Sequence, residues 1–363
     1  MRSLCVAACA AAVGLACSHR PPADFAPDPG LVSRIRAIEM QAPTQACPGE
    51  SFPSSYTAIL DDGSRIPFAT RYDRKHPPRL HVVFLERQSP DALALEDGGW
   101  NAEPDPLASA LRGFRLRAAL YANPAIADSV SIAPSYDCVR HAFTFSGETG
   151  MDGPDVVIRL GLVRSPFVAR LLVAQIEVAE APPQFMLADA DLVPPSDWLV
   201  VTSAGGRGAR GTGGRDGAKG ANGMAGCPGG DGGPGGQGGN GYRGGDGGRG
   251  GRFTIMVPTE EPFMAGLVVA RSPGGGEGPG GRGGEGGQGG RAGVGTVRNG
   301  QACAAGKDGA TGVPGREGPP GEAGRPGGRP QILTVPQREL FGPRAPAELL
   351  QLLELRERQP RRP

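Results

Sequence analysis

Side chains that could do chemistry are few and scattered along this chain. No two histidines have the spacing of a helical metal-ligand pair or lie beside a cysteine pair, and they stand at His19, His76, His81 and His141. The sequence contains neither a Gly-x-Ser-x-Gly nucleophile elbow nor a phosphate loop ending in Gly-Lys-Ser or Gly-Lys-Thr. We therefore expect no catalytic residue and no cofactor, and we predict that the protein is not an enzyme.

Two further groups of side chains have a weaker connection with function. Asp189, Asp191 and Asp152 could supply oxygen ligands to calcium, although this pattern is not specific enough to assign a metal site. Trp100 and Trp198 could line a carbohydrate-binding face, but tryptophans in β-sheet domains more often belong to the core. No metal site is therefore predicted.

The N-terminus has the layout of a secretory signal peptide. Met1-Arg2 precedes an uncharged apolar run, residues 4–16, that is too short to span a bilayer. The run ends in Gly14-Leu15-Ala16-Cys17-Ser18, which resembles a bacterial lipobox, although Gly14 replaces the usual large aliphatic residue. We predict a signal peptide over 1–16 and acylation of Cys17. The protein is then exported to the cell envelope and held on a membrane by its N-terminal lipid, as an outer-membrane or periplasmic lipoprotein.

The remaining cysteines can be paired. Once the leader is removed and Cys17 is acylated, Cys47 and Cys138 remain in the first half of the chain and Cys227 and Cys303 in the second. Four cysteines allow three pairings. Their distribution favours Cys47 with Cys138 and Cys227 with Cys303, and such bonds require an oxidising compartment.

The first half of the mature chain is typical of an all-β domain. Residues 17–45 contain few apolar side chains and are expected to be a flexible tether. From 46 to 203, short runs of β-forming residues alternate with turn residues, which favours an antiparallel β-sandwich. A hairpin is expected at 56–60 and 64–68 around Asp61-Asp62-Gly63, and further strands at 80–85, 114–121, 130–133, 141–145, 156–163, 171–178 and 198–202.

Glycine occupies every third position in three tracts, 205–252, 275–295 and 306–329, within a glycine-rich region that spans 204–330. A period of three matches the polyproline II helix, so the in-frame glycines lie along one bare ridge. The net charge is only +1, and acidic and basic residues are interspersed in these tracts. Nucleic acid binding is therefore not expected.

The third tract resembles collagen. It contains Gly315-Arg316-Glu317, Gly318-Pro319-Pro320 and Gly324-Arg325-Pro326, with proline and oppositely charged neighbours in each triplet or the next. On these triplets the chain resembles bacterial collagen-like exported lipoproteins, whose functions are unknown. The resemblance implies a triple helix of three chains and hence a homotrimer.

The first two tracts depart from collagen. Eight of the sixteen triplets in the first begin Gly-Gly, and the second repeats glycine at the third position, as in Gly278-Pro279-Gly280. Two of the three ridges are then bare, which suits several glycine-rich helices packed side by side. This pattern resembles the glycine-rich domain of Obg-type GTPases. We favour a bundle within one chain, and so a monomer, with the triple helix as the alternative.

Two segments flank or interrupt the glycine frame. Residues 253–271 are expected to form two strands with a turn at Glu260-Glu261-Pro262, a detour that could return the chain on itself. Residues 331–363 contain a strand at 332–335 and a short amphipathic helix over 346–358, which we expect to pack against its own chain because it is too short for a stable coiled coil.

Taken together, the sequence predicts a structural or interaction protein. The alternative is a surface adhesin or binding module whose β-sandwich recognises a glycan or a protein. An exposed aromatic patch near Trp100 would favour that alternative.

Overall fold

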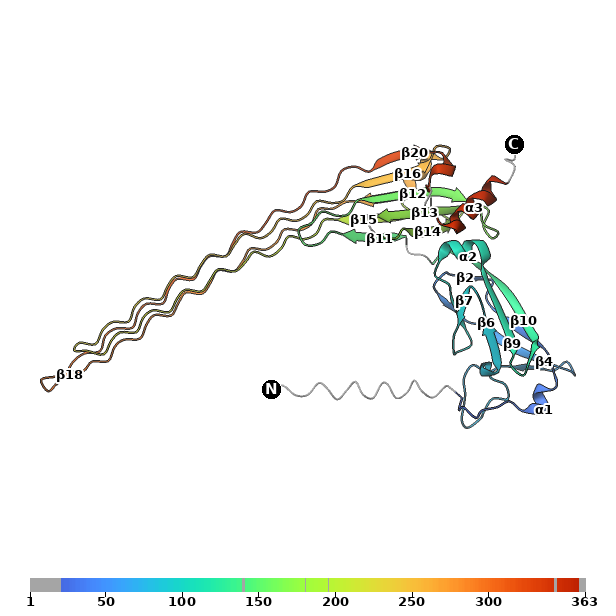
Figure 1. Ribbon diagram of the computed structural model, residues 1–363, viewed down its shortest axis with the longest axis horizontal. Coiled ribbons are helices and arrows are strands. Elements are labelled where there is room, and N and C mark those ends of the chain that lie inside the picture. The colour runs from blue at the N-terminus through green and yellow to red at the C-terminus, as the bar shows by residue number, and fades with distance from the viewer. Residues whose placement is uncertain (1–20, 139–140, 180, 195, 343–344, 359–363) are drawn as a thin grey trace.

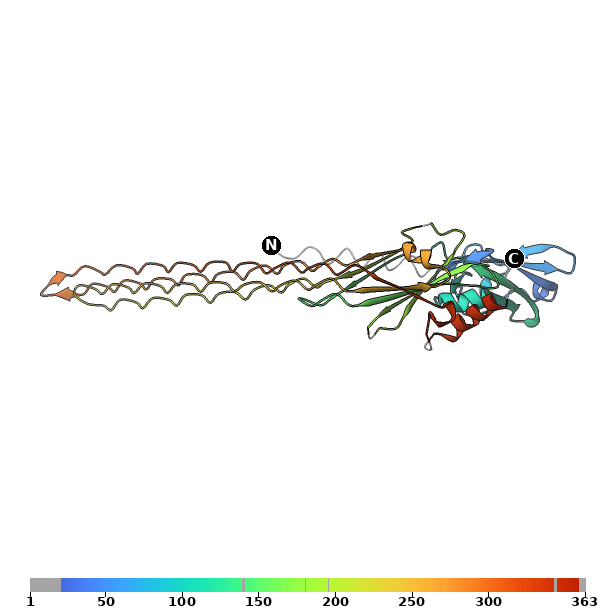
Figure 2. The same cartoon turned by 90° about the horizontal axis from the view of Figure 1, so that it is seen from above.

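Strands dominate the structure and helices are few, so the fold is largely β. The computed structural model describes residues 21–138, 141–179, 181–194, 196–342 and 345–358. The predicted signal peptide and Cys17 lie outside the described residues. A base of β-sheets carries one long, thin extension, and that extension is made of the glycine tracts (Figures 1 and 2).

The N-terminal part of the base is built from three small sheets, β1-β4-β5, β2-β10-β9-β6 and β3-β8-β7. Its elements are α1 (Pro29–Val32), β1 (Ile35–Gln41), β2 (Gln45–Ala46), β3 (Ser51–Phe52), β4 (Ser55–Leu60), β5 (Arg65–Pro67), η2 (Val82–Phe84), β6 (Leu85–Gln88), β7 (Ala92–Ala94), β8 (Trp100–Ala102), α2 (Pro106–Arg112), β9 (Phe114–Leu120) and β10 (Asn123–Pro134). Apart from α2, these elements contribute to, or pack against, one cluster of buried side chains that includes Tyr56, Trp100 and Phe114.

Two expectations for this part were wrong in detail. Much of the expected tether is structured, because Ile35, Ile38 and Met40 of β1 point into the core and β1 pairs with β4. Part of the strand expected at 80–85 is instead a single 3₁₀ turn, η2. The Nδ1 atom of His81 caps that turn by accepting a hydrogen bond from the Val83 N–H at 3.1 Å.

The second part of the base combines strands from both halves of the sequence. It contains a five-stranded sheet, β14-β13-β12-β16-β20, and a three-stranded sheet, β11-β15-β17. The elements are β11 (Ala142–Ser146), β12 (Val156–Val163), β13 (Leu171–Val178), β14 (Gln184–Asp189), β15 (Leu199–Ala204), β16 (Phe253–Pro258), η3 (Pro262–Leu267), β17 (Val268–Arg271), β20 (Gln331–Val335), η4 (Gln337–Glu339) and α3 (Ala347–Glu357).

Residues 46–203 therefore contribute to three clusters of buried side chains and not to one. Ile158 of β12, Val201 of β15 and Ile255 of β16 belong to a second cluster that joins the five-stranded and three-stranded sheets. The two strands expected in 253–271 are present, but β16 lies in one sheet and β17 in the other. The chain thus leaves the three-stranded sheet twice to enter the glycine-rich extension, and each time it returns to the five-stranded sheet.

The C-terminal helix packs on its own chain. Leu349 and Leu352 of α3 are buried with Leu171 of β13 on the other face of the five-stranded sheet. Leu107 of α2 joins the same cluster and so links the two parts of the base. Among the described residues, none of the helices has the length and apolar character needed to cross a membrane.

Candidate interaction surface

Four glycine-rich segments form the extension. We name them segment I (205–226), segment II (229–251), segment III (273–295) and segment IV (304–329). Segments I and III leave from β15 and β17, whereas segments II and IV return to β16 and β20. Segments I and III therefore run outward and segments II and IV run inward, side by side in both views (Figures 1 and 2).

Backbone hydrogen bonds at every third residue join the segments that run in the same direction. The N–H of Gly208 in segment I donates to the carbonyl of Gly276 in segment III at 2.9 Å, and this step repeats from Gly205 to Gly226. In the same way, the N–H of Gly232 in segment II donates to Lys307 O in segment IV at 2.8 Å.

Antiparallel neighbours are joined as regularly. Gly233 of segment II donates to Ala221 O of segment I at 2.7 Å, Gly281 of segment III to Tyr242 O of segment II at 2.9 Å, and Gly309 of segment IV to Gly290 O of segment III at 2.8 Å. Segments II and III each bond to three neighbours, while segments I and IV each bond to two. Segments II and III are therefore the inner pair.

This arrangement explains which segments have two bare ridges. In segment II, Gly232 donates to segment IV and the next residue, Gly233, donates to segment I, so neighbours lie against both positions. A Cβ on Gly241 would overlap the carbonyl oxygen of Gly281. The outer segments I and IV need a bare ridge only on the side that faces the bundle. The collagen-like third tract is segment IV, one of these outer segments.

Asn and Asp side chains make a second set of links between segments. Each accepts a hydrogen bond at 2.6–2.9 Å from a backbone N–H of a neighbouring segment. These N–H groups are ones that do not donate to a backbone carbonyl of any described residue. The pairs are Asp216 with Glu285, Asn222 with Arg291, Asp308 with Ala292, Asp231 with Lys307, Asn240 with Arg316 and Asp246 with Glu322.

At the far end, a disulfide between Cys227 and Cys303 links the turn between segments I and II to the connection between segments III and IV. That connection contains a short hairpin, β18 (Val297–Arg298) and β19 (Gln301–Ala302), whose turn residues Asn299 and Gly300 both have positive φ. The apolar side chains of Met224, Val294 and Val297 are largely exposed here. We call this end of the bundle the tip.

At the other end, carboxylates of the base fix the bundle to the sheets. Asp152 Oδ1 accepts a hydrogen bond from the Arg249 N–H at 2.7 Å. Asp155 binds both the backbone N–H and the guanidinium of Arg252. The Arg252 hydrogen bonds are the main reason that the pKa of Asp155 lies below its usual value. The bundle is thus joined to the base through polar contacts as well as through the continuing strands.

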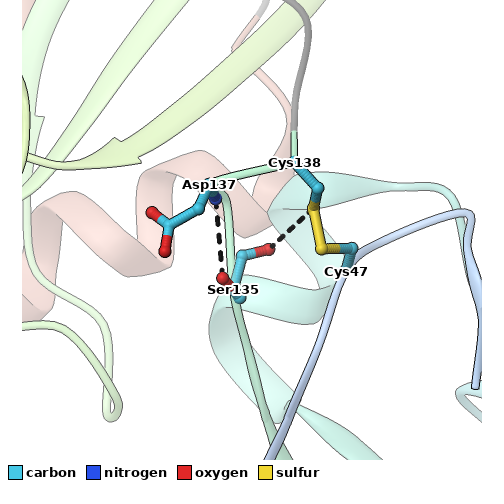
Figure 3. Close-up of a disulfide and its surroundings, with 4 residues drawn as sticks. All are labelled: Cys47, Ser135, Asp137 and Cys138. Atoms are coloured by element: carbon cyan, nitrogen blue, oxygen red, sulfur yellow. Dashed lines mark hydrogen bonds between the residues drawn. A yellow bond between two sulfur atoms is a disulfide. The ribbon is translucent and has the colours of Figure 1, made fainter.

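The second disulfide, Cys47–Cys138, lies in the base (Figure 3). It joins the residue after β2 to the chain that follows β10, close to the point where these two strands pair. Asp137 N donates to the hydroxyl of Ser135 beside it at 3.5 Å. Glu50 approaches both sulfurs, but sulfurs bonded to each other are not thiolate ligands for a metal. The two disulfides fit an extracellular or periplasmic location.

The other side chains singled out in the sequence do not converge within the described residues. His81 is buried, and burial lowers the pKa of its imidazole, whereas His76 is exposed beside Asp73. His141 packs at a tilt on Trp198, with ring centroids 5.4 Å apart. His19 lies outside the described residues.

The carboxylates considered for calcium have other partners. Asp191 forms an ion pair with Arg170 at 2.7 Å, Asp189 accepts a hydrogen bond from the Asp191 N–H, and Asp152 binds the bundle. Both tryptophans are buried, and the Trp100 indole N–H donates to Tyr56 Oη at 3.0 Å. The exposed aromatic patch that would favour an adhesin is therefore not found at Trp100.

The outer face of β6, β9 and β10 carries a groove of about 680 Å³. Polar side chains along it are Gln88, Ser89, Arg115, Arg117, Ser129 and Ser131. Arg115 is held by Asp91, whose buried carboxylate also binds Arg112. Sequence reasoning missed this groove because its residues come from three strands and form no local motif.

No protein-family model matches the chain, and no curated protein matches it significantly.

Proposed function

We propose that this protein is a non-enzymatic, exported structural or interaction protein in which the glycine-rich bundle is a stiff spacer. In this proposal the four segments are polyproline II helices, the base is a β-sandwich, and a lipid on Cys17 anchors the chain to a membrane of the cell envelope. The spacer holds the tip away from the base, where it is available to other molecules.

The observation that carries the proposal is the unbroken series of hydrogen bonds from Gly205 at the base to Gly226 at the tip. Individual glycine-rich helices are flexible because glycine has the largest backbone entropy to lose. Four of them joined at every third residue can bend only if many hydrogen bonds change together. At a rise of about 3.1 Å per residue, segment I alone spans about 65 Å.

Solution scattering with sedimentation tests the spacer. The full chain carrying Cys17→Ala, which cannot be acylated, should be a monomer with a longest dimension of about 90 Å or more, the sum of the bundle and one eight-residue strand. A compact protein of this length would have a radius of gyration of about 21 Å. A trimer, or a monomer with that compact value, would contradict the proposal.

Export and anchoring need a separate test in cells. The wild-type chain should incorporate a radioactive fatty acid and fractionate with membranes, and Cys17→Ala should abolish both. Cys9→Ala is the matched control, because the second cysteine of the leader would leave with the signal peptide. Labelling that persists in the Cys17→Ala variant would rule out this anchor.

A second candidate function is recognition of a glycan or a protein by the base. The groove on β6, β9 and β10 favours it, because hydroxyl, amide and guanidinium groups line an open hollow. Binding of the full chain to a glycan array should be lost in Ser129→Ala/Ser131→Ala if the groove is the site. Retained binding in that variant would place recognition elsewhere.

A further inference from the structure

The two long sides of the bundle differ in how their charges are arranged. One side is formed where the third residues of segment I triplets meet the second residues of segment III triplets. The hydrogen bonds of Asp216 with Glu285 and of Asn222 with Arg291 show that these two ridges are adjacent. Five exposed cations lie on this side, which we call the basic face: Arg207, Arg210, Lys219, Arg282 and Arg291.

On these two ridges, three of the cations follow one another without an acid between them. The offset of 69 residues between segments I and III places Arg282 level with Gly213, one triplet beyond Arg210. Arg207, Arg210 and Arg282 therefore follow one another along the bundle axis, and each lies about 9 Å from the next at the polyproline II rise. Asp216 and Glu285 come next, followed by Lys219 and Arg291 nearer the tip.

None of the five cations forms an ion pair with any residue that the structure describes. Their one side-chain hydrogen bond is from Arg207 Nε to the carbonyl of Glu277, at 3.3 Å. Unpaired cations at fixed positions on a stiff support keep their full charge available to a ligand, because no internal salt bridge has to be broken first.

The opposite side is a built-in comparison. Where segments II and IV meet, it also carries five cations: Arg243, Arg249, Lys307, Arg316 and Arg325. Here, however, Asp231, Asp246 and Glu322 lie among them. Among the described residues, Arg243 is the one cation of these five that forms ion pairs, with Asp246 at 2.8 Å and with Glu322 at 3.4 Å. We call this side the mixed face.

We propose that the basic face binds a linear acidic polysaccharide along the length of the bundle. A straight row of cations matches a linear polymer, and a spacing of about 9 Å matches sparse charges better than DNA, which carries a charge every 1.7 Å or so. The choice of a polysaccharide rests on the proposed export, since such polymers are ligands that an envelope protein meets.

The test measures binding of fluorescent polygalacturonate, a polymer of uronic acids, to the full chain carrying Cys17→Ala. Neutral dextran is the control ligand. We expect binding that weakens steeply as salt rises. Arg207→Gln/Arg210→Gln/Arg282→Gln should weaken it by about tenfold or more, whereas the matched variant Lys307→Gln/Arg316→Gln/Arg325→Gln should change it by less than about twofold.

Several results would overturn the inference. They are equal loss in both variants, which would indicate a general charge effect, no binding of polygalacturonate, or tighter binding of duplex DNA or of phosphatidylglycerol vesicles. Solution scattering of each variant checks that the bundle is intact. A chain with the expected length that binds no acidic polymer would contradict this inference and leave the spacer function standing.

Discussion

The Oδ1 atom of Asn240 accepts a hydrogen bond from the backbone N–H of Arg316 at 2.9 Å, across 76 residues of sequence. The same separation joins Asp231 to Lys307 and Asp246 to Glu322. A constant separation means that segments II and IV are held in one register. Short polar side chains therefore set the alignment of the bundle together with glycine.

Replacing Asn240 with Ala should loosen the bundle locally. The variant loses one hydrogen bond, which is worth about 0.5–1.5 kcal/mol, so hydrogen exchange at the Arg316 amide should become faster. Gln237→Ala is the control, because the Gln237 side chain lies on the same ridge and forms no hydrogen bond with the described residues. Unchanged exchange at Arg316 in Asn240→Ala would contradict the role given to this side chain.

Two adjacent glycines should respond very differently to alanine. A Cβ on Gly275 would overlap Gly206 O, whereas a Cβ on Gly276 finds its nearest neighbour, Arg207 Cγ, at 3.9 Å. We expect Gly275→Ala to lower the free energy of unfolding by about 1–3 kcal/mol or more. Gly276→Ala should be neutral or stabilising by about 0.4–1 kcal/mol. Urea denaturation measures both, and equal losses would be inconsistent with the close packing described here.

Removing the tip disulfide should affect one end of the bundle. Cys227→Ser/Cys303→Ser is expected to cost about 2–4 kcal/mol, because the bond closes a long loop in the unfolded chain. Exchange at Gly226 and Thr296, whose amides bond within the tip, should rise most. Cys47→Ser/Cys138→Ser is the control and should leave exchange in the bundle unchanged. Unchanged exchange at Gly226 and Thr296 in the tip variant would show that the tip is held together without its disulfide.

Lowering the pH should destabilise the β-sheet base of the molecule through Asp91. Burial acts to raise the pKa of this carboxyl, but hydrogen bonds from Arg115 and Arg112 outweigh it and hold the pKa below its usual value of 3.8. A folded pKa below the unfolded one stabilises the fold above the unfolded pKa, and that stability is lost as pH falls through the folded pKa.

Asp91→Asn should therefore be less stable than wild type at pH 7, by about 1–3 kcal/mol, because two half-exposed arginines lose a buried partner. The difference should shrink as the pH falls below about 4 and the wild-type carboxyl becomes protonated. Urea unfolding at several pH values measures it. A difference that does not shrink as the wild-type carboxyl is protonated would show that the charge of Asp91 contributes nothing.

Several strands could be predicted from local pattern alone. β12 and β13 coincide with the expected ranges because Val, Ile and Leu form dense runs there, and alternation with arginine indicated β9. β1 was missed because its buried residues are separated by Arg36 and Glu39, and only pairing with β4 reveals the face they share. Such pairing is a long-range property that a local pattern does not contain.

The glycine repeats predicted that the glycine-rich segments pack closely together, but not which segments lie next to each other. The first tract contains both an outer and an inner segment, yet its period runs unbroken through the turn at Gly226-Cys227-Pro228, because a glycine falls in frame on each side. In this tract, only Cys227 indicated where the turn lies. Which segments are inner depends on how four distant stretches assemble, and that follows from the two sheets that hold their ends.

The constant separations between segments limit how this molecule can change in size during evolution. A triplet inserted into one segment alone would shift its register against every neighbour, leaving Asp and Asn side chains opposite the wrong amides. Growth requires one triplet in each of the four segments, twelve residues for each gain of about 9 Å. Lengths of such bundles should therefore differ between species in whole steps.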